Sequence, residues 1–206
     1  MAVHKLDKSI GLDLILQTPG GGIAATQSLV NYLQKVFGRN IRAVVPQVAL
    51  SAGTMIACSC RTILMAKHSN LGPIDPQLAG IPAYGVIREF KRACREVKKD
   101  PSRIPIWQSI IGKYMPTFIS QCENAIACSN AFVENQLATG MFADDPAPTA
   151  KAKAVVKGLS DFVQNRTHDR HLHAEDCIKL GLDVQTVEED QGYQDLLLTV
   201  HHCYIT

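Results

Sequence analysis

Residues 11–22 read GLDLILQTPGGG, an apolar run that ends in a proline and three glycines. The Leu- and Ile-rich run predicts a buried strand, and Pro19 with the glycines predicts a tight turn directly after it. Apolar residues then recur with helical spacing across 23–37, and a second buried strand is predicted at 41–45. Strand, turn, helix and strand in this order indicate a parallel sheet with crossover helices.

The rest of the chain continues this pattern and then becomes mostly helical. The 206 residues suit one domain, 1–206, of the α/β class with a mostly parallel sheet and a helical C-terminal half. Because the first strong strand begins so early, we expect an N-terminal strand or segment to be missing. Helices are predicted at 51–58, 84–99, 106–141 with an interruption near Pro116, 150–163 and 174–180, strands at 62–66 and 182–187, and a loop at 71–82.

The composition is that of an ordinary globular protein. Hydrophobic residues make up 46% and charged residues 19%, and the formal net charge of +2 is too small to indicate a nucleic-acid or membrane-surface partner. No apolar run reaches the ~18 residues of a membrane span. The seven cysteines are an odd number and no secretory signal opens the chain, which predicts reduced thiols and a cytoplasmic location.

A candidate nucleophile follows the second strand. Residues 49–53 read ALSAG, which matches a nucleophile elbow with Ala49 in place of its first glycine. At a sharp strand-to-helix bend, small neighbours leave the hydroxyl of Ser51 exposed. The alternative is that Ser51 is simply the N-cap of the helix that starts there.

A candidate anion site follows the first strand at residues 18–22. Glycines there let backbone N–H groups point into a site, and the oxyanion of an acyl-transfer reaction needs two such donors. A plain helix-entry turn and a phosphate loop are the alternatives. The phosphate loop is disfavoured because no Gly-Lys-Ser/Thr follows.

Histidine and cysteine clusters give a weaker signal. His168, His171 and His173 are spaced as zinc ligands could be, but a zinc site needs a further ligand and matching geometry, and a polar loop before a helix is the more common outcome. Cys58 and Cys60 have the wrong spacing for a zinc knuckle and are expected in the core. We therefore expect no metal and no cofactor.

Four segments in order resemble one protein family. They are 14–21 (LILQTPGG), 49–57 (ALSAGTMIA), 69–77 (SNLGPIDPQ) and 167–169 (THD), the last followed by Glu175 and Gly181. Together they look like the serine dehydrogenase proteinase family, distant relatives of the Clp protease subunit and signal peptide peptidase A. The resemblance implies a Clp protease/crotonase-like fold and a serine peptidase.

The resemblance also implies the site residues. Carried over by motif, Ser51 is the nucleophile, Asp75 the acid and His168 the base, the N–H groups of Gly20 and Ala52 form the oxyanion hole, and Gly21 and Gly22 bind substrate. Related peptidases use a Ser-Lys dyad, for which the sequence offers Lys91, Lys98, Lys99 and Lys113.

The same resemblance implies a peptide or protein substrate and a homo-oligomer, with residues 84–141 as the contact region. Two other functions stay open for this fold. A crotonase-like enzyme would use the oxyanion hole to stabilise a thioester enolate, and a non-catalytic scaffold would keep the architecture without the chemistry.

Overall fold

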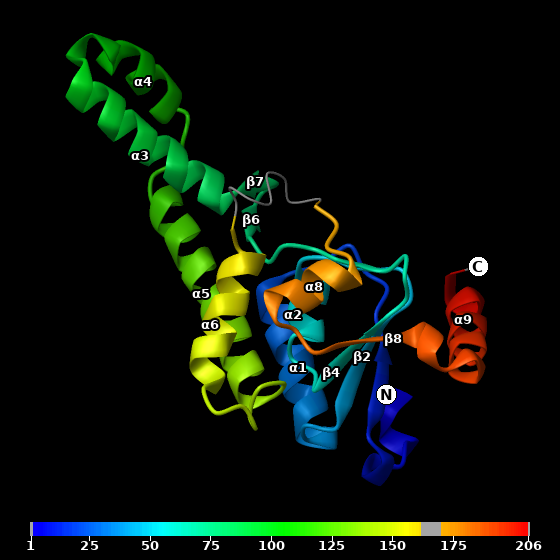
Figure 1. Cartoon of the computed structure of the whole chain (residues 1–206). Coiled ribbons are helices and arrows are strands. Elements are labelled where there is room, and N and C mark those ends of the chain that lie inside the picture. Colours follow the sequence, from blue (N-terminus) through cyan, green and yellow to red (C-terminus); the bar gives the residue numbers. More distant parts are fainter. Residues whose placement is uncertain (1, 162–169, 206) are drawn as a thin grey trace.

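The computed structural model describes residues 2–161 and 170–205 and is built around a four-stranded sheet (Figure 1). The strands lie in the order β1-β2-β4-β8, and each neighbouring pair is parallel. All four lie inside predicted strands, and the expected α/β fold with a parallel sheet is confirmed. Their bounds are Leu12–Ile15 for β1, Ile41–Val45 for β2, Thr62–Met65 for β4 and Val184–Thr186 for β8.

One face of the sheet is covered by the crossover helices and by the helices of the C-terminal half (Figure 1). Leu14, Ala43 and Ile63 pair side by side across three strands, and all three side chains belong to this main core. Alternate residues of a strand point to the same face, so this row sets the register of the sheet. The covering helices are α1 (Ile23–Phe37), α2 (Ala52–Ala57), α5 (Phe118–Thr139), α6 (Pro148–Leu159) and α8 (Ala174–Leu180).

The opposite face carries a smaller core that the sequence analysis did not predict. Val44 and Leu64 of the sheet pack there against Val187 and Leu197. The last two residues belong to a 3-10 turn, η4 (Val187–Glu189), and to a C-terminal helix, α9 (Gln191–Ile205). Consecutive leucines and paired histidines blur the helical stripe of this segment, so its helix depends on packing against the sheet rather than on its own pattern.

A polar cluster joins the smaller core to the sheet. Arg42 forms a two-pronged ion pair with Asp13, through Nε–Oδ1 at 2.7 Å and an Nη–Oδ2 contact at 2.6 Å. Tyr193 of α9 donates its hydroxyl to Asp13 Oδ2 at 2.9 Å. Partial burial by itself would raise the pKa of Asp13, but the hydrogen bonds from Arg42 and Tyr193 outweigh it and hold that pKa below its usual value.

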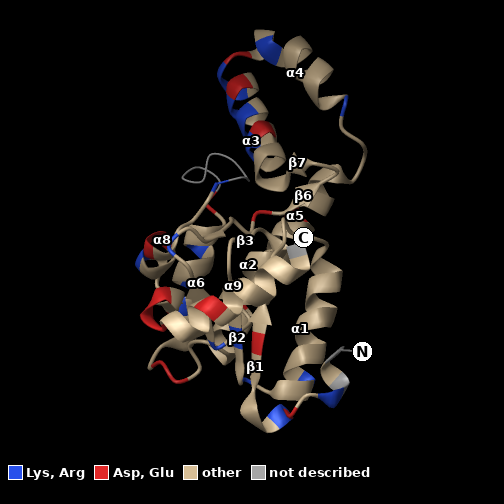
Figure 2. Cartoon of the chain, turned by 90° about the vertical axis from the view of Figure 1, so that its right-hand side faces the viewer, with Lys and Arg blue, Asp and Glu red and all other residues tan. Residues whose placement is uncertain are grey.

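A helical arm projects from the sheet (Figures 1 and 2). Its base is an antiparallel hairpin, β6 (Gln77–Leu78) with β7 (Ile81–Pro82), inside the predicted loop 71–82. Two-residue strands are too short to give a sequence pattern. The arm continues through α3 (Ala83–Lys99), η3 (Pro101–Arg103) and α4 (Ile104–Ile111), and α5 leads back to the body. Within the described ranges, none of the helices is both long and apolar enough to cross a membrane.

The ion pair of Asp13 predicts a specific loss of stability in acid. Its pKa is depressed in the folded state, so its contribution is present above the unfolded pKa of about 4 and is lost as the pH falls through the lower folded value. Asp13→Asn should lower the urea midpoint at pH 7, and its difference from wild type should shrink below about pH 4. Asp144→Asn is the control, because the Asp144 side chain is 91% exposed and should leave the midpoint unchanged. A difference for Asp13→Asn that stays constant from pH 7 to pH 3 would contradict the prediction.

Candidate active site

Ser51 lies at a strained bend between a short strand and a short helix. It follows β3 (Val48–Ala49) and precedes α2, and its backbone angles are φ 52° and ψ −110°. A non-glycine residue in this region costs about 1–3 kcal/mol and is found mostly at functional sites. Ser51 occupies the N-cap position, but its side chain makes no capping hydrogen bond. Among the described residues its hydroxyl has no hydrogen-bond partner, so the N-cap alternative does not account for it.

The bend needs small residues on the inner side of the helix. A Cβ atom placed on Gly53 would lie 2.6 Å from Thr18 Cγ2 and 3.1 Å from Ala49 Cβ. Ala52 and Gly53 are both buried, which confirms that the elbow is crowded. The small residues of the ALSAG motif therefore have a steric reason.

Thr54 ties the elbow to the segment that carries Asp75. Its side chain is fully buried, and its hydroxyl oxygen lies 2.9 Å from both Ala49 O and Gly72 O. The same oxygen accepts the N–H of Gly72 at 3.0 Å. The sequence analysis did not single out Thr54, because a threonine in an apolar helix gives no signal until its tertiary partners are known.

The glycine turn lies directly beside Ser51. Thr18 pairs with Ala49, and its carbonyl accepts the N–H of Leu50 at 3.0 Å. Gly20, at φ 124°, approaches so closely that a Cβ atom there would lie 3.0 Å from Ser51 Cβ and 3.6 Å from Ser51 Oγ. Gly20 is needed here because its conformation and the available space both exclude a side chain.

The amide of Gly20, however, already has an acceptor. Its N–H donates to Thr18 Oγ1 at 3.1 Å. Gly21 and Gly22 have open space where a Cβ would stand, and both line the cavity in front of Ser51. Within the described part of the chain, neither the Gly21 N–H nor the Ala52 N–H has a hydrogen-bond acceptor. Of the predicted pair, the Ala52 amide is thus free, and Gly21 is the residue next to Gly20 whose amide is free.

A cavity of about 280 Å³ opens in front of Ser51. It lies where the turn after β1 meets the elbow, beyond the carboxyl ends of the strands, which is the usual place for a ligand in an open α/β sheet. A larger hollow of about 470 Å³ includes Gly11, Asn40 and Arg42, at the opposite ends of β1 and β2, and holds none of the predicted site residues. The cavity in front of Ser51 is lined by Gly21, Gly22, Ile23, Ser51, Met55, Ile74, Pro76, Gln77, Leu78, Ala125 and Ser129.

Asp75 is buried beside this cavity. Its exposed fraction is 2%, and its neighbours Ile74 and Pro76 both line the cavity. Ser129 of α5 donates its hydroxyl to Ile74 O at 2.9 Å and fixes the segment against the helix. The structure therefore brings Ser51, the glycine turn and the Asp75 segment together around one cavity. Ser129 is a second positioning residue that the sequence analysis missed.

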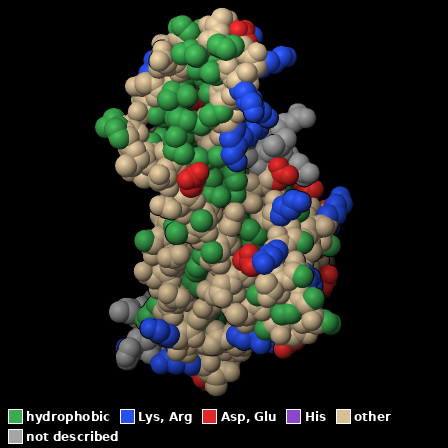
Figure 3. Space-filling view, turned by 90° about the vertical axis from the view of Figure 1, so that its left-hand side faces the viewer, with side chains coloured by type: hydrophobic (Ala, Val, Ile, Leu, Met, Phe, Trp, Pro, Cys, Tyr) green, Lys and Arg blue, Asp and Glu red, His purple; other side chains and the backbone are tan. Residues whose placement is uncertain are grey.

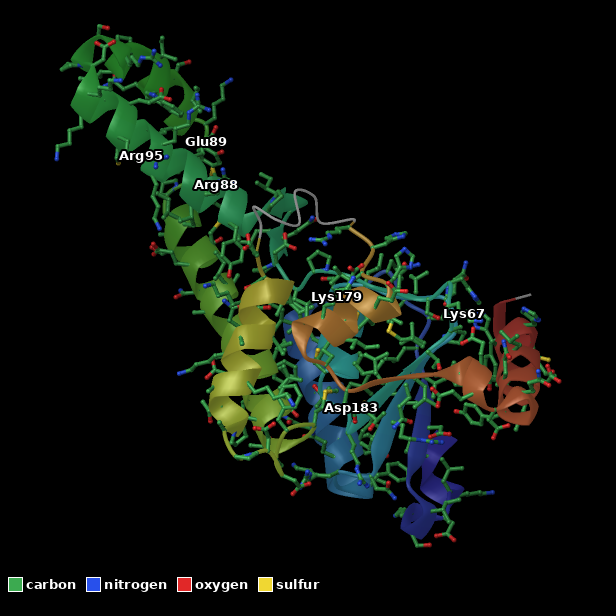
Figure 4. All side chains as sticks on the ribbon, in the orientation of Figure 1. Lys67, Arg88, Glu89, Arg95, Lys179 and Asp183 are labelled. Carbon is green, nitrogen blue, oxygen red and sulfur yellow. The ribbon has the colours of Figure 1, made fainter. Side chains whose placement is uncertain are left out.

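The structure places the candidate lysine bases, but not the candidate histidine base. His168 falls outside the described residues. Lys91, Lys98 and Lys99 are exposed on α3 and Lys113 is exposed after α4, so all four belong to the arm. Figure 4 labels Arg88 and Arg95 along the same helix, which points away from the sheet. None of these four lysines lines the cavity in front of Ser51.

Three residues of the histidine and cysteine clusters, His173, Cys58 and Cys60, have structural roles. His173 is the N-cap of α8 and forms a capping box with Asp176, as expected of a polar loop before a helix. Cys58 and Cys60 are buried at the end of α2, as predicted. Burial raises the pKa of both thiols, that of Cys60 to about 12, so neither competes with Ser51 as a nucleophile.

Comparisons with known proteins identify the family of the chain. The model of the ClpP-like SDH-type serine proteinase family matches residues 1–200. Two proteins of Methanocaldococcus jannaschii are similar over most of the chain. "Uncharacterized protein MJ0137" is 30% identical over 93% of this chain and 59% of its own length, and "Uncharacterized protein MJ1495" is 25% identical over 96% and 60%. The chain thus spans about three-fifths of these relatives, and no solved structure matches it significantly. From a family match that covers nearly the whole chain, we conclude that this protein belongs to the ClpP-like SDH-type serine proteinases.

Proposed function

We propose that this protein is a serine peptidase that cleaves peptide bonds through an acyl-enzyme formed on Ser51. One observation carries the proposal: the Ser51 hydroxyl stands at a strained bend, 3.6 Å from the position of a Cβ on Gly20, and faces a cavity. Strain of this kind holds a nucleophile exposed at the end of a strand. The family membership supports the same chemistry.

Two backbone amides would hold the oxyanion. Ala52 N–H stands at the start of α2, directly after the nucleophile, and the glycine turn supplies the other donor. The resemblance to the Clp protease favours Gly20, whereas the hydrogen bond from Gly20 N–H to Thr18 Oγ1 favours the next amide, that of Gly21. Each such donor is worth on the order of 3 kcal/mol in the transition state.

The proposed base is His168, with Asp75 as the residue that orients it. Asp75 supports this role by its burial and its place in the segment that lines the cavity. His168 would take the proton of Ser51 Oγ as the oxygen attacks the carbonyl, and would return it to the leaving amine. Asp75 would stabilise the imidazolium formed between these steps.

The arm supports the proposed homo-oligomer. An apolar groove of about 240 Å³ lies between α3 and α4, and Figure 3 shows hydrophobic side chains gathered on that part of the arm. Residues 83–117 hold eight of the 21 Lys and Arg residues but three of the 19 Asp and Glu residues, so the arm is net positive and the rest of the chain net negative (Figure 2). Opposite charge draws the arm towards the body of a second copy, and the groove gives that contact an apolar centre. The groove is lined by Ala93, Cys94, Val97, Ile104, Trp107, Gln108 and Ile111.

The role of Ser51 as nucleophile predicts covalent labelling at this residue. A fluorophosphonate probe should label the assembled protein, and Ser51→Ala should abolish the labelling and reduce peptide hydrolysis by on the order of 10⁴-fold or more. Ser59→Ala is the control, because Ser59 is buried at the end of α2 with its hydroxyl bonded to Met55 O, and labelling should persist. Labelling that survives Ser51→Ala would contradict the proposal. Activity on an acyl thioester that survives it would favour a crotonase-like reaction.

The buried hydroxyl of Thr54 is expected to support both the stability of the protein and the reactivity of Ser51. Thr54→Val keeps the shape of the side chain but leaves the Gly72 N–H without its acceptor, which should cost about 1–3 kcal/mol in the free energy of unfolding. The rate of Ser51 labelling should fall as well, because the bend loses its anchor. Thr54→Ser keeps the hydroxyl and should restore most of the labelling rate. Equal labelling rates in Thr54→Val and wild type would show that the elbow does not depend on this contact.

The groove of the arm is expected to be needed for assembly. Ile104→Glu places a charge in the groove of the arm and should lower the mass measured by light scattering. Ser109→Glu is a matched control, because it places the same charge at an exposed position of the same helix, α4, outside the lining of the groove. A wild-type protein that is monomeric at every concentration, or an equal loss of mass in both variants, would contradict the proposed assembly.

A further inference from the structure

The cavity in front of Ser51 is lined mainly by apolar side chains that come from separate elements. Ile23 belongs to α1, Met55 to α2, Leu78 to the hairpin and Ala125 to α5, and Ile74 lies in the segment before the hairpin. No Lys, Arg, Asp, Glu or His among the described residues lines it. The polar side chains of the lining, those of Ser51, Gln77 and Ser129, are neutral, so a charged group that entered would lose its water without gaining an oppositely charged partner, which costs several kcal/mol.

The hydroxyl of Ser129, the polar side-chain group that α5 contributes to this cavity, already forms a hydrogen bond within the protein. Ala125 and Ser129 are four residues apart and so lie on the same face of the helix. Ser129 is fully buried, and its hydroxyl donates to Ile74 O at 2.9 Å. Because this donor is committed to the protein, the α5 side of the cavity offers a ligand mainly apolar contact.

The volume of the cavity limits the size of the ligand that it can hold. Its volume of about 280 Å³ lies just below the ≈ 300–1,000 Å³ of pockets that bury a whole drug-sized ligand. A single side chain fits this space better than a nucleotide or a coenzyme. Its position beside Ser51 places that side chain next to the atom under attack.

We propose that this cavity is the specificity pocket for one uncharged, apolar substrate side chain of the size of Leu, Met or Phe, and that Ala125 limits how large that side chain can be. The inference rests on the proposed function in assigning this side chain to the residue whose carbonyl Ser51 attacks. Ile23, Met55 and Leu78 form its apolar wall. Ser129 fixes Ile74, another residue of the lining, through its hydrogen bond to Ile74 O.

Binding and turnover test the pocket separately. In the Ser51→Ala protein, calorimetry measures the affinity of N-acetylated tripeptides that differ in their C-terminal residue, Leu, Phe, Ala, Lys or Asp. In the wild-type protein, fluorogenic peptides with the same residues before the scissile bond measure kcat/KM. We expect Leu and Phe to exceed Lys and Asp by roughly tenfold or more in both measurements.

Three variants test the assigned wall. Ala125→Leu fills the pocket and should lower the affinity and kcat/KM for Leu and Phe by roughly tenfold, with the Ala peptide changed less than about twofold. Ala127→Leu is the matched control, since Ala127 is exposed on the same helix and should change nothing. Leu78→Ala enlarges the pocket and should raise the preference for Phe over Leu, which keeps the proposal testable if Ala125→Leu does not fold.

The outcomes separate this inference from the proposed function. Ser51 labelling with no preference among the five peptides, or no binding of any peptide, overturns the pocket. Binding of the Leu and Phe peptides that Ala125→Leu removes, in a protein whose Ser51 is never labelled, supports the pocket and overturns the peptidase. Equal effects of Ala125→Leu and Ala127→Leu overturn the role of Ala125.

Discussion

The strained, positive-φ backbone of Ser51 is the constraint on which the rest of the site depends. Such a bend is unfavourable by itself, so the surrounding structure must hold it. On one side the backbone of Thr18 pairs with Ala49 and accepts the N–H of Leu50. On the other side the buried hydroxyl of Thr54 binds Ala49 O and both backbone groups of Gly72. Released from either contact, the chain would relax and the hydroxyl would turn from the glycine turn.

The parallel sheet gives these contacts their common location. The glycine turn follows β1, the elbow follows β2 and β3, and β5 (Asn70–Leu71) pairs with β3 before the segment of Asp75. In a parallel sheet the carboxyl ends of neighbouring strands meet at one edge, so three segments far apart in the sequence reach one cavity. The arm adds the hairpin and α5, which close the cavity with apolar side chains.

The sequence predicted the sheet and most helices, because each has a strong local pattern. The helical spacing of 23–37 matches α1, and Gly181 ends α8 in the left-handed conformation expected of a C-terminal glycine. It did not predict the β6–β7 hairpin, whose strands have two residues each, or α9, whose apolar residues form no clear stripe. Both depend on contacts with distant segments, which leave no periodicity in a single sequence.

The sequence by itself determined the sheet strands and most helices through their local patterns. It also determined the elbow and the glycine turn, because a sharp bend and a close backbone approach each demand small residues at fixed positions. The tertiary structure alone decided that Gly20 lies against Ser51 and that its amide bonds to Thr18. It alone also revealed the roles of Thr54 and Ser129, and placed the candidate lysines on the arm. Hydrogen bonds and burial between residues far apart in the chain depend on how its segments pack, and no local pattern records that packing.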